Sequence, residues 1–163
     1  MSKYYANASI EINAPIETVW AVMLDLPRYG EWNPFVVDIA GIDGAAPISQ
    51  IGARLLLDVR MVNNKTLRCW ETITHMDAPA HDDTGQQTAL LVYRYTSWPA
   101  QLGLVQAGRR QSLTQQKDRP TIYFTEENFH GILSPFLPLT GVRDGFQRHA
   151  QALKQRAEAL VAN

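Results

Sequence analysis

Four side chains that could bind or polarise a carbonyl group stand out in this 163-residue sequence: Glu71, Tyr93, Arg110 and Glu127. Each lies in one of the stretches between turn-like segments that we interpret as β-strands. A guanidinium binds carboxylate and carbonyl oxygens, a tyrosine hydroxyl donates or accepts a hydrogen bond, and a buried carboxyl group can move a proton. On one face of a sheet, these groups would suit an oxygen-bearing small molecule.

The turn "KDRP" (117–120) predicts how two of these strands pair. A hairpin centred between the second and third residues of this turn places Arg110 opposite Glu127. The looser connections between the preceding strands add two more polar groups and several apolar ones to the same face. That face then collects Glu71, Ile73, Leu91, Tyr93, Arg110, Glu127 and Phe129. A single β-bulge would turn part of this set outward.

The Arg110–Glu127 pair has two interpretations. As an exposed cross-strand ion pair it would contribute only about 0.2–1 kcal/mol and have no role in function. If the pair is partly buried, Arg110 could orient a ligand carboxylate or carbonyl while Glu127 fixes its rotamer. The sequence leaves both interpretations open.

Signatures of other chemistry are missing from the sequence. It contains no G-x-S-x-G, P-loop or G-x-G-x-x-G motif, and its four histidines include no i, i+4 pair. No other group of residues has the spacing of a metal site. We therefore expect neither a metal nor a cofactor.

Alternation and turn signals predict seven strands, mostly joined by short turns and therefore antiparallel. The strand-like stretches are YYANASIEI, FVVDIA, ARLLLDVRM, LRCWETITHM, TALLVYRYTSW, LVQAGRRQSLTQQ and TIYFTEENFHGI. The segments interpreted as turns include GIDG (41–44), APAHDDTG (78–85) and WPAQLG (98–103). Two short helices are expected after the first strand, where Pro15 marks a helix start and Pro27 a helix end.

Apolar or small residues recur at three- and four-residue spacing from Val142 to Leu160. This pattern predicts one long helix near residues 137–161, with Phe146 on its apolar face. A twisted antiparallel sheet must bury one face, and a single helix cannot fill the whole concave side, so we expect an internal cavity. Trp32 and Phe35, just after the predicted helix stop, would border its mouth.

Composition narrows the class of protein. Hydrophobic residues make up 45%, charged residues 19% and the formal net charge is −1. These values suit one globular domain over residues 1–163 and argue against binding to nucleic acid or an acidic membrane surface. A single cysteine fits a reducing cytoplasm, and no apolar run has the length of a signal peptide or a membrane span. We expect a cytoplasmic protein without membrane insertion; its oligomeric state stays open.

The stretch INAPIETVWAVMLDLPRYGEWNPFV resembles the opening of the START-like, polyketide cyclase/dehydrase superfamily (SRPBCC). The matching positions are Ala14, Pro15, Val19, Trp20, Asp25, Trp32, Asn33 and Pro34. IGARLLL, ENFHGIL and GFQRHAQALKQRAEAL resemble the family's third strand, last strand and C-terminal helix. The resemblance implies an α+β helix-grip fold, in which a curved seven-stranded antiparallel sheet surrounds a long C-terminal helix and an apolar pocket.

The resemblance also implies a choice of functions. The expected function is binding of a hydrophobic or aromatic small molecule, lipid- or polyketide-like, in the cavity. The alternative is an enzyme of cyclase, aromatase or dehydratase type, and a third is a protein-binding module, for which no exposed apolar stripe is evident. The expected ligand-binding residues are Trp32, Phe35, Glu71, Tyr93, Arg110, Glu127, Phe129 and Phe146. The sequence departs from the family in its sixth strand, where Gly108, Arg110 and Ser112 replace a common Gly-x-His-x-Phe, which implies a more polar pocket.

Overall fold

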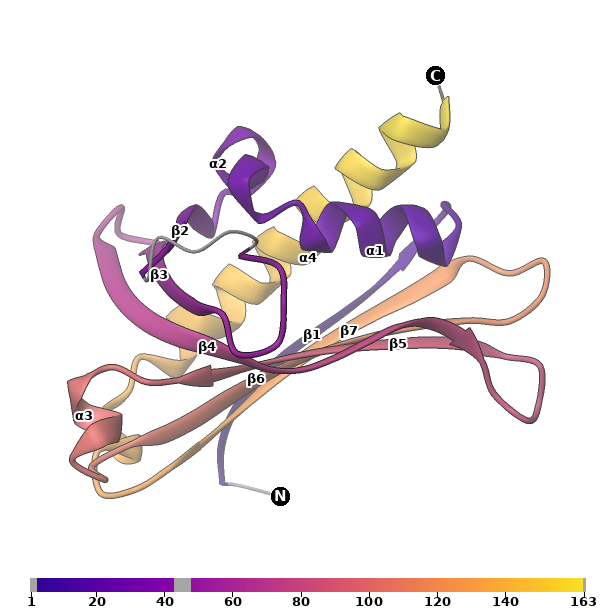
Figure 1. Cartoon of the computed structure of the whole chain (residues 1–163). Helices are drawn as coiled ribbons and strands as arrows, with labels where there is room; N and C mark the ends of the chain where they lie inside the picture. The colour runs from indigo at the N-terminus through magenta and orange to yellow at the C-terminus, as the bar shows by residue number, and fades with distance from the viewer. Residues whose placement is uncertain (1–2, 43–47, 163) are drawn as a thin grey trace.

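A curved antiparallel sheet forms the frame of the molecule (Figure 1). The computed structural model describes residues 3–42 and 48–162. Within them the sheet has seven strands in the order β1-β7-β6-β5-β4-β3-β2. In chain order the strands are β1 (Tyr4–Ile12), β2 (Val36–Gly41), β3 (Arg54–Arg60), β4 (Thr66–His81), β5 (Gln87–Tyr95), β6 (Gln106–Gln115) and β7 (Thr121–His130).

The two longest helices lie on one face of this sheet, and the longest of them runs diagonally across it (Figure 1). They are α1 (Ile16–Leu24), η1 (Leu26–Arg28), α2 (Tyr29–Trp32), α3 (Trp98–Gln101), η2 (Ser134–Phe136) and α4 (Leu139–Ala162). Helix α4 contacts β1 and α1, and its buried side includes Phe146, Ala150, Leu153 and Ala157. This three- and four-residue spacing is the stripe that the sequence predicted.

The helix-grip architecture expected from the sequence is confirmed. The seven strands, the short helices after β1 and the long C-terminal helix all form. Helix α1 starts directly after Pro15 and ends before Pro27, as the missing amide and fixed φ of proline require. Trp20, one of the positions on which the family resemblance rests, is in the core and only 8% exposed.

Two segments interpreted as turns are part of regular structure. Strand β4 continues through Ala78 and Pro79 to His81, and its pairing with β5 shifts between Asp77 and Ala80. Proline has no amide to donate to a ladder, and this irregularity is where a strand can hold it. Residues 98–101 form the short helix α3, which begins with proline in its first turn.

Only part of a third segment interpreted as a turn, 41–44, lies within the described residues. Gly41 is the last residue of β2. Residues 43 and 44 lie outside the described residues, so the predicted turn there stays a prediction.

The predicted register of the last hairpin is wrong by one residue. Arg109 pairs with Glu127, and Arg110 pairs with Glu126. The hairpin is centred on Asp118, which takes a left-handed backbone conformation with φ of 59°. Because side chains alternate between faces, this shift turns Arg110 outward and Arg109 inward.

Two glycines on α4 make the packing of this helix testable. A Cβ added at Gly145 would collide with the aromatic ring of Phe35, whereas one at Gly141 would meet only the flexible end of Met61, at 2.8 Å. Alanine is favoured over glycine inside a helix by up to about 1 kcal/mol. We expect Gly145→Ala to lower the free energy of unfolding by about 1–3 kcal/mol, because an aromatic ring in a packed core cannot move freely.

Gly141→Ala is the matched control on the same helix, and it should be neutral or slightly stabilising. Urea denaturation measures the free energy of unfolding of both variants. Equal stability of the two variants would contradict the tight contact between α4 and Phe35.

Candidate binding and catalytic pocket

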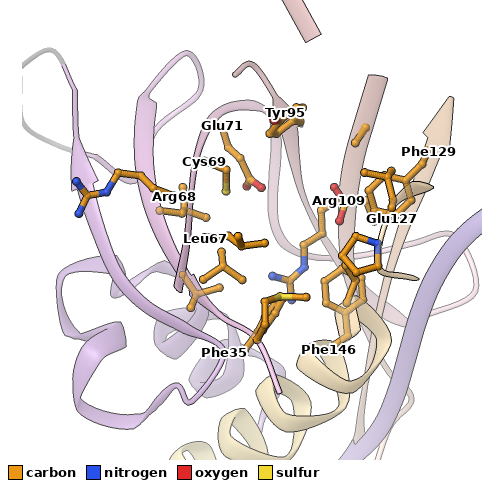
Figure 2. A pocket seen from close by; sticks show the side chains of 18 of the residues that line it. Phe35, Leu67, Arg68, Cys69, Glu71, Tyr95, Arg109, Glu127, Phe129 and Phe146 are labelled. Carbon is orange, nitrogen blue, oxygen red and sulfur yellow. The ribbon is translucent and has the colours of Figure 1, made fainter. Parts of the chain in front are cut away.

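A cavity of about 310 Å³ lies between the sheet, the end of β2 nearest α2, and the first turns of α4 (Figure 2). Most of its wall is apolar. The wall residues are Phe35, Val36, Leu57, Val59, Met61, Leu67, Cys69, Val105, Ala107, Phe129, Leu137, Pro138, Val142 and Phe146. Polar groups come from Glu71, Tyr95, Arg109, Glu127 and, at the exposed edge, Arg68. The cavity therefore combines an apolar lining with a few ionisable groups, the usual composition of a small-molecule site.

Arg109 is the buried cation of this pocket and is 6% exposed. Its Nε donates to Thr125 Oγ1 at 3.1 Å, and its Nη2 donates to Tyr123 Oη at 3.4 Å. The guanidinium carbon lies 4.3 Å from the ring centroid of Phe146, a cation–π contact from α4. The guanidinium is thus fixed from two sides, by β7 and by the helix.

A second layer of side chains holds these partners in place. Tyr123 Oη donates to Gln111 Oε1 at 2.7 Å, so its lone pair is free to accept the bond from Arg109. Tyr123, Thr125 and Gln111 are each at most 1% exposed. Among the described residues, no protein group bonds Nη1 of Arg109. Its N–H groups are therefore able to donate to an oxygen of a molecule in the cavity, and the other bonds of Arg109 hold the guanidinium in place.

Glu71 on β4 and Glu127 on β7 direct their carboxyl groups into the same pocket (Figure 2). Burial raises the pKa of Glu71 to about 7, against the lowering effect of Arg109. Burial and then the charge of Glu71 raise the pKa of Glu127 to about 8. Since each carboxylate disfavours ionisation of the other, the pair keeps at least one proton near neutral pH. The pocket can therefore both donate and accept a proton.

Burial alone would lower the pKa of Arg109, but Tyr123, Glu71 and Glu127 raise it above its ordinary value. Among the described residues, neither carboxyl group forms an ion pair with the guanidinium. Figure 2 shows why: the guanidinium reaches away from the two carboxyl groups, toward Phe35 and Phe146. A ligand in this cavity would meet a fixed guanidinium at one end and, at the other, two carboxyl groups that keep at least one proton.

Behind the aromatic wall lies a buried polar contact that the sequence analysis missed. Asn33 Oδ1 accepts from the backbone amides of Phe35 and Val36, at 3.0 and 3.1 Å. The amide nitrogen of Asn33 must then face His149 Nδ1, 2.8 Å away, and donate to it. Burial and the charge of Arg109 lower the pKa of His149 well below its usual range, so the ring is neutral and protonated at Nε2.

This contact explains the segment around Trp32. The Asn33 side chain ties the start of β2 to α4, and the rings of Tyr29, Trp32 and Tyr123 surround His149, with centroids 6.0, 5.8 and 5.9 Å from it. Trp32 and Asn33 thus pack the helix against the pocket wall, whereas Phe35, two residues further on, lines the pocket itself. Its only sequence signal was the Trp-Asn-Pro motif, which did not point to a histidine more than a hundred residues away.

The family model for polyketide cyclase/dehydrase and lipid transport proteins matches residues 6–99, more than half of the chain. The chain belongs to this polyketide cyclase/dehydrase and lipid transport family. A search of curated proteins gives no match. The matched region covers β1 to β5 and therefore includes Phe35 and Glu71, whereas Arg109 and Glu127 come after it.

Solved structures share the fold of this family member across nearly the whole chain. A hypothetical protein from Helicobacter pylori superposes with a TM-score of 0.72 at 8% identity, covering 96% of this chain and 89% of the other. The Zhui aromatase/cyclase from a Streptomyces species gives 0.69 at 13% identity, with 96% and 94% covered. A START superfamily protein from Mycobacterium smegmatis gives 0.62 at 18% identity, with 96% and 99% covered. At these identities the similarity shows the fold.

Within this family fold, the predicted site residues divide into two groups. Those that line the pocket are Phe35, Glu71, Glu127, Phe129 and Phe146. Tyr93 is buried in the core beside the pocket, 3% exposed, and Trp32 packs on Tyr29 and His149. Arg110 lies on the opposite, exposed face of β6. A ligand-binding role for each pocket residue stays a prediction.

The structure replaces Arg110 with its neighbour Arg109 as the pocket cation. The sequence places two arginines side by side, and alternation sends one to each face of the strand. Only the centre of the hairpin decides which one is buried. The alternation of β6 itself was a signal, because Ala107, Arg109, Gln111 and Leu113 form its buried face.

Two further findings concern metals and membranes. The described residues include no group of three or more His, Cys, Asp or Glu side chains placed to hold a metal ion. None of their helices is both long and apolar enough to span a bilayer.

The carboxyl pair predicts how stability depends on pH. In the unfolded chain both groups have a pKa near 4.3, so the folded protein binds more protons between that value and about 8. The contribution of this pair to the free energy of unfolding should therefore fall as pH rises through this range, on the order of a few kcal/mol in total. The Glu71→Gln/Glu127→Gln double variant should lose this dependence.

Urea denaturation from about pH 5 to pH 8 measures the free energy of unfolding of the wild type and of the double variant. His149 is present in both, so its own titration in the unfolded state cancels in the comparison. Arg110→Met, on the other face of the sheet, should keep the wild-type profile. Parallel profiles of the wild type and the double variant would contradict burial of the two carboxyl groups.

Proposed function

We propose that this protein binds a hydrophobic or aromatic small molecule, lipid- or polyketide-like, in the cavity between the sheet and α4. The observation that carries the proposal is a buried, pre-positioned Arg109 in a mostly apolar cavity, whose Nη1 forms no hydrogen bond with any residue that the structure describes. Membership of a family described by polyketide and lipid chemistry supports it. The single cysteine supports a cytoplasmic location for this activity.

The charges of the pocket favour a particular kind of ligand. A carbonyl or phenol oxygen could accept from Arg109, and a second oxygen could accept from the protonated carboxyl pair. A pure hydrocarbon chain would offer no acceptor to the donors of Nη1, which is costly inside a protein. A ring system with oxygens at opposite ends therefore fits better than an unsubstituted acyl chain. The cavity of about 310 Å³ is at the small end for such ligands.

The proposal predicts a difference between two neighbouring arginines. Arg109→Met should weaken binding of a hydroxyanthraquinone, an aromatic polyketide, by about tenfold or more, because a charge-assisted hydrogen bond contributes about 1.5–3 kcal/mol. Arg110→Met removes the same charge from the exposed face and should bind like the wild type. Fluorescence titration measures the hydroxyanthraquinone affinity of both variants, and their melting temperatures show that each is folded.

Equal affinity of the two variants would contradict a role for Arg109 in binding. If Arg109→Met does not fold, Arg109→Lys keeps the charge but loses the planar fork, and its affinity should also fall. Wild-type protein that binds no hydroxyanthraquinone and carries no co-purified compound in native mass spectrometry would contradict the proposal as a whole.

A second candidate function is an enzyme of cyclase, aromatase or dehydratase type. The observation that favours it is the carboxyl pair with pKa values of about 7 and 8, which suits general acid–base catalysis at neutral pH. One carboxylate would remove a proton next to a carbonyl that Arg109 polarises. The new carbon–carbon bond would form at a second carbonyl, whose oxygen would take a proton from the other carboxyl group.

Turnover separates the two candidates. If the protein is an enzyme, a short poly-β-keto thioester should be converted faster than without protein, giving a cyclised product that has lost water. Glu71→Gln or Glu127→Gln should then slow this step by about 10²- to 10⁴-fold, while hydroxyanthraquinone affinity changes only a few-fold. Product formation at the background rate, with ligand binding intact, would leave the binding function alone.

A further inference from the structure

Two loops at one end of the sheet expose large apolar side chains. The first connects β5 to β6 and contains α3, and the second connects β7 to α4 and contains η2. Trp98 and Leu102 on the first loop are 65% and 66% exposed, and Ile132 and Phe136 on the second are 71% and 81% exposed. We call residues 96–105 and 131–138 together the apolar tip.

The two halves of the tip are joined. The backbone amide of Leu133 donates to the carbonyl of Leu104 at 3.1 Å, and at the base of the loops Gln106 pairs with His130. Gly131 approaches Leu104 so closely that a Cβ there would meet its carbonyl oxygen. Figure 1 shows α3 at this end of the sheet, opposite the end where the C-terminus of α4 lies.

The tip is also free of charge. Residues 96–107 and 131–142 contain no Asp, Glu, Lys or Arg, although charged residues make up 19% of the chain. Single exposed apolar side chains are ordinary on a protein surface. Four of them on two joined loops, in stretches of chain that carry no charged residue, are unusual.

We propose that the apolar tip docks this protein on the surface of a lipid bilayer by shallow insertion of both loops. Tryptophan and phenylalanine favour the boundary between lipid head groups and acyl chains, and a surface without charge enters it at little electrostatic cost. Because the tip lacks basic residues, docking should not require anionic lipids. This surface contact differs from membrane spanning, which no described helix could achieve.

A second copy of the chain is a poorer occupant. At about 200 Å² for a large apolar side chain, the exposed parts of these four residues present on the order of 500 Å². A stable protein interface buries about 800 Å² on each partner. A lipid bilayer needs no matching shape, so a small protruding apolar surface suits it better than a protein partner.

The tip adjoins the cavity. The pocket wall includes Val105 on the first loop and Leu137 and Pro138 on the second. Docking would therefore bring one side of the pocket to the membrane surface, where an apolar ligand dissolves. The docking proposal rests on the loops themselves and holds whichever molecule the pocket binds.

Flotation with phosphatidylcholine vesicles tests the proposal. Wild-type protein should float with vesicles that contain no anionic lipid, and added phosphatidylserine or high salt should change its partition little. Trp98→Gln/Phe136→Gln should reduce the partition coefficient more than tenfold, because each ring loses its transfer from water to the interface. The control Leu160→Gln/Val161→Gln changes side chains that are 53% and 51% exposed near the C-terminus, and should float like the wild type.

The melting temperature and hydroxyanthraquinone affinity of the tip variant show whether its fold and pocket are intact. The proposal is overturned if the wild type does not float, if the tip variant floats equally well, or if flotation requires phosphatidylserine and disappears in high salt. A concentration-dependent dimer that the tip variant loses, without flotation of the wild type, would assign the tip to self-association instead. Failure of ligand binding with flotation retained would overturn the proposed function and leave the docking surface standing.

Discussion

The burial of one guanidinium constrains much of this structure. Arg109 is nearly inaccessible to water, and a charge in such a position is strongly destabilising unless hydrogen bonds and counter-charges surround it. Thr125 and Tyr123 provide the hydrogen bonds, Phe146 provides a ring face, and the field of two glutamates keeps the guanidinium charged. These partners come from two strands, β4 and β7, and from helix α4, so the position of Arg109 depends on how the sheet packs against the helix.

The same constraint links the pocket to the segment after α2. Phe146 can lie over Arg109 only if α4 crosses the sheet at the right depth. That depth is fixed by Phe35 against Gly145 and by the hydrogen bond from Asn33 to His149. The Trp-Asn-Pro segment therefore acts on the pocket indirectly, as a brace for the helix that forms one wall. Where a site is built on rigid elements braced in this way, its polar groups are held ready before a ligand arrives.

Sequence patterns were enough to predict the strands, the long helix and the cavity, because alternation and helical spacing are local properties. They could not identify the buried arginine, since that depended on whether one loop residue, Asp118, takes a left-handed conformation and centres the hairpin. A shift of one residue exchanged Arg109 for Arg110 while leaving Glu71 and Glu127 correctly placed. The Asn33–His149 contact joins distant segments, and no spacing in the sequence reports it.

The apolar tip and the pocket depart from the usual distribution of residues in opposite ways: the tip exposes apolar side chains and the pocket buries a charge. Inside, a charge stands where apolar residues would pack more easily, so recognition explains Arg109 better than stability does. At the apolar tip, large apolar side chains stand where charge would improve solubility, and contact with an apolar partner explains them in the same way. A polar group in the interior and an apolar group on the exterior each weaken the isolated protein. Each becomes favourable only when something binds: an oxygen-bearing molecule at Arg109, and an apolar phase at Trp98 and Phe136.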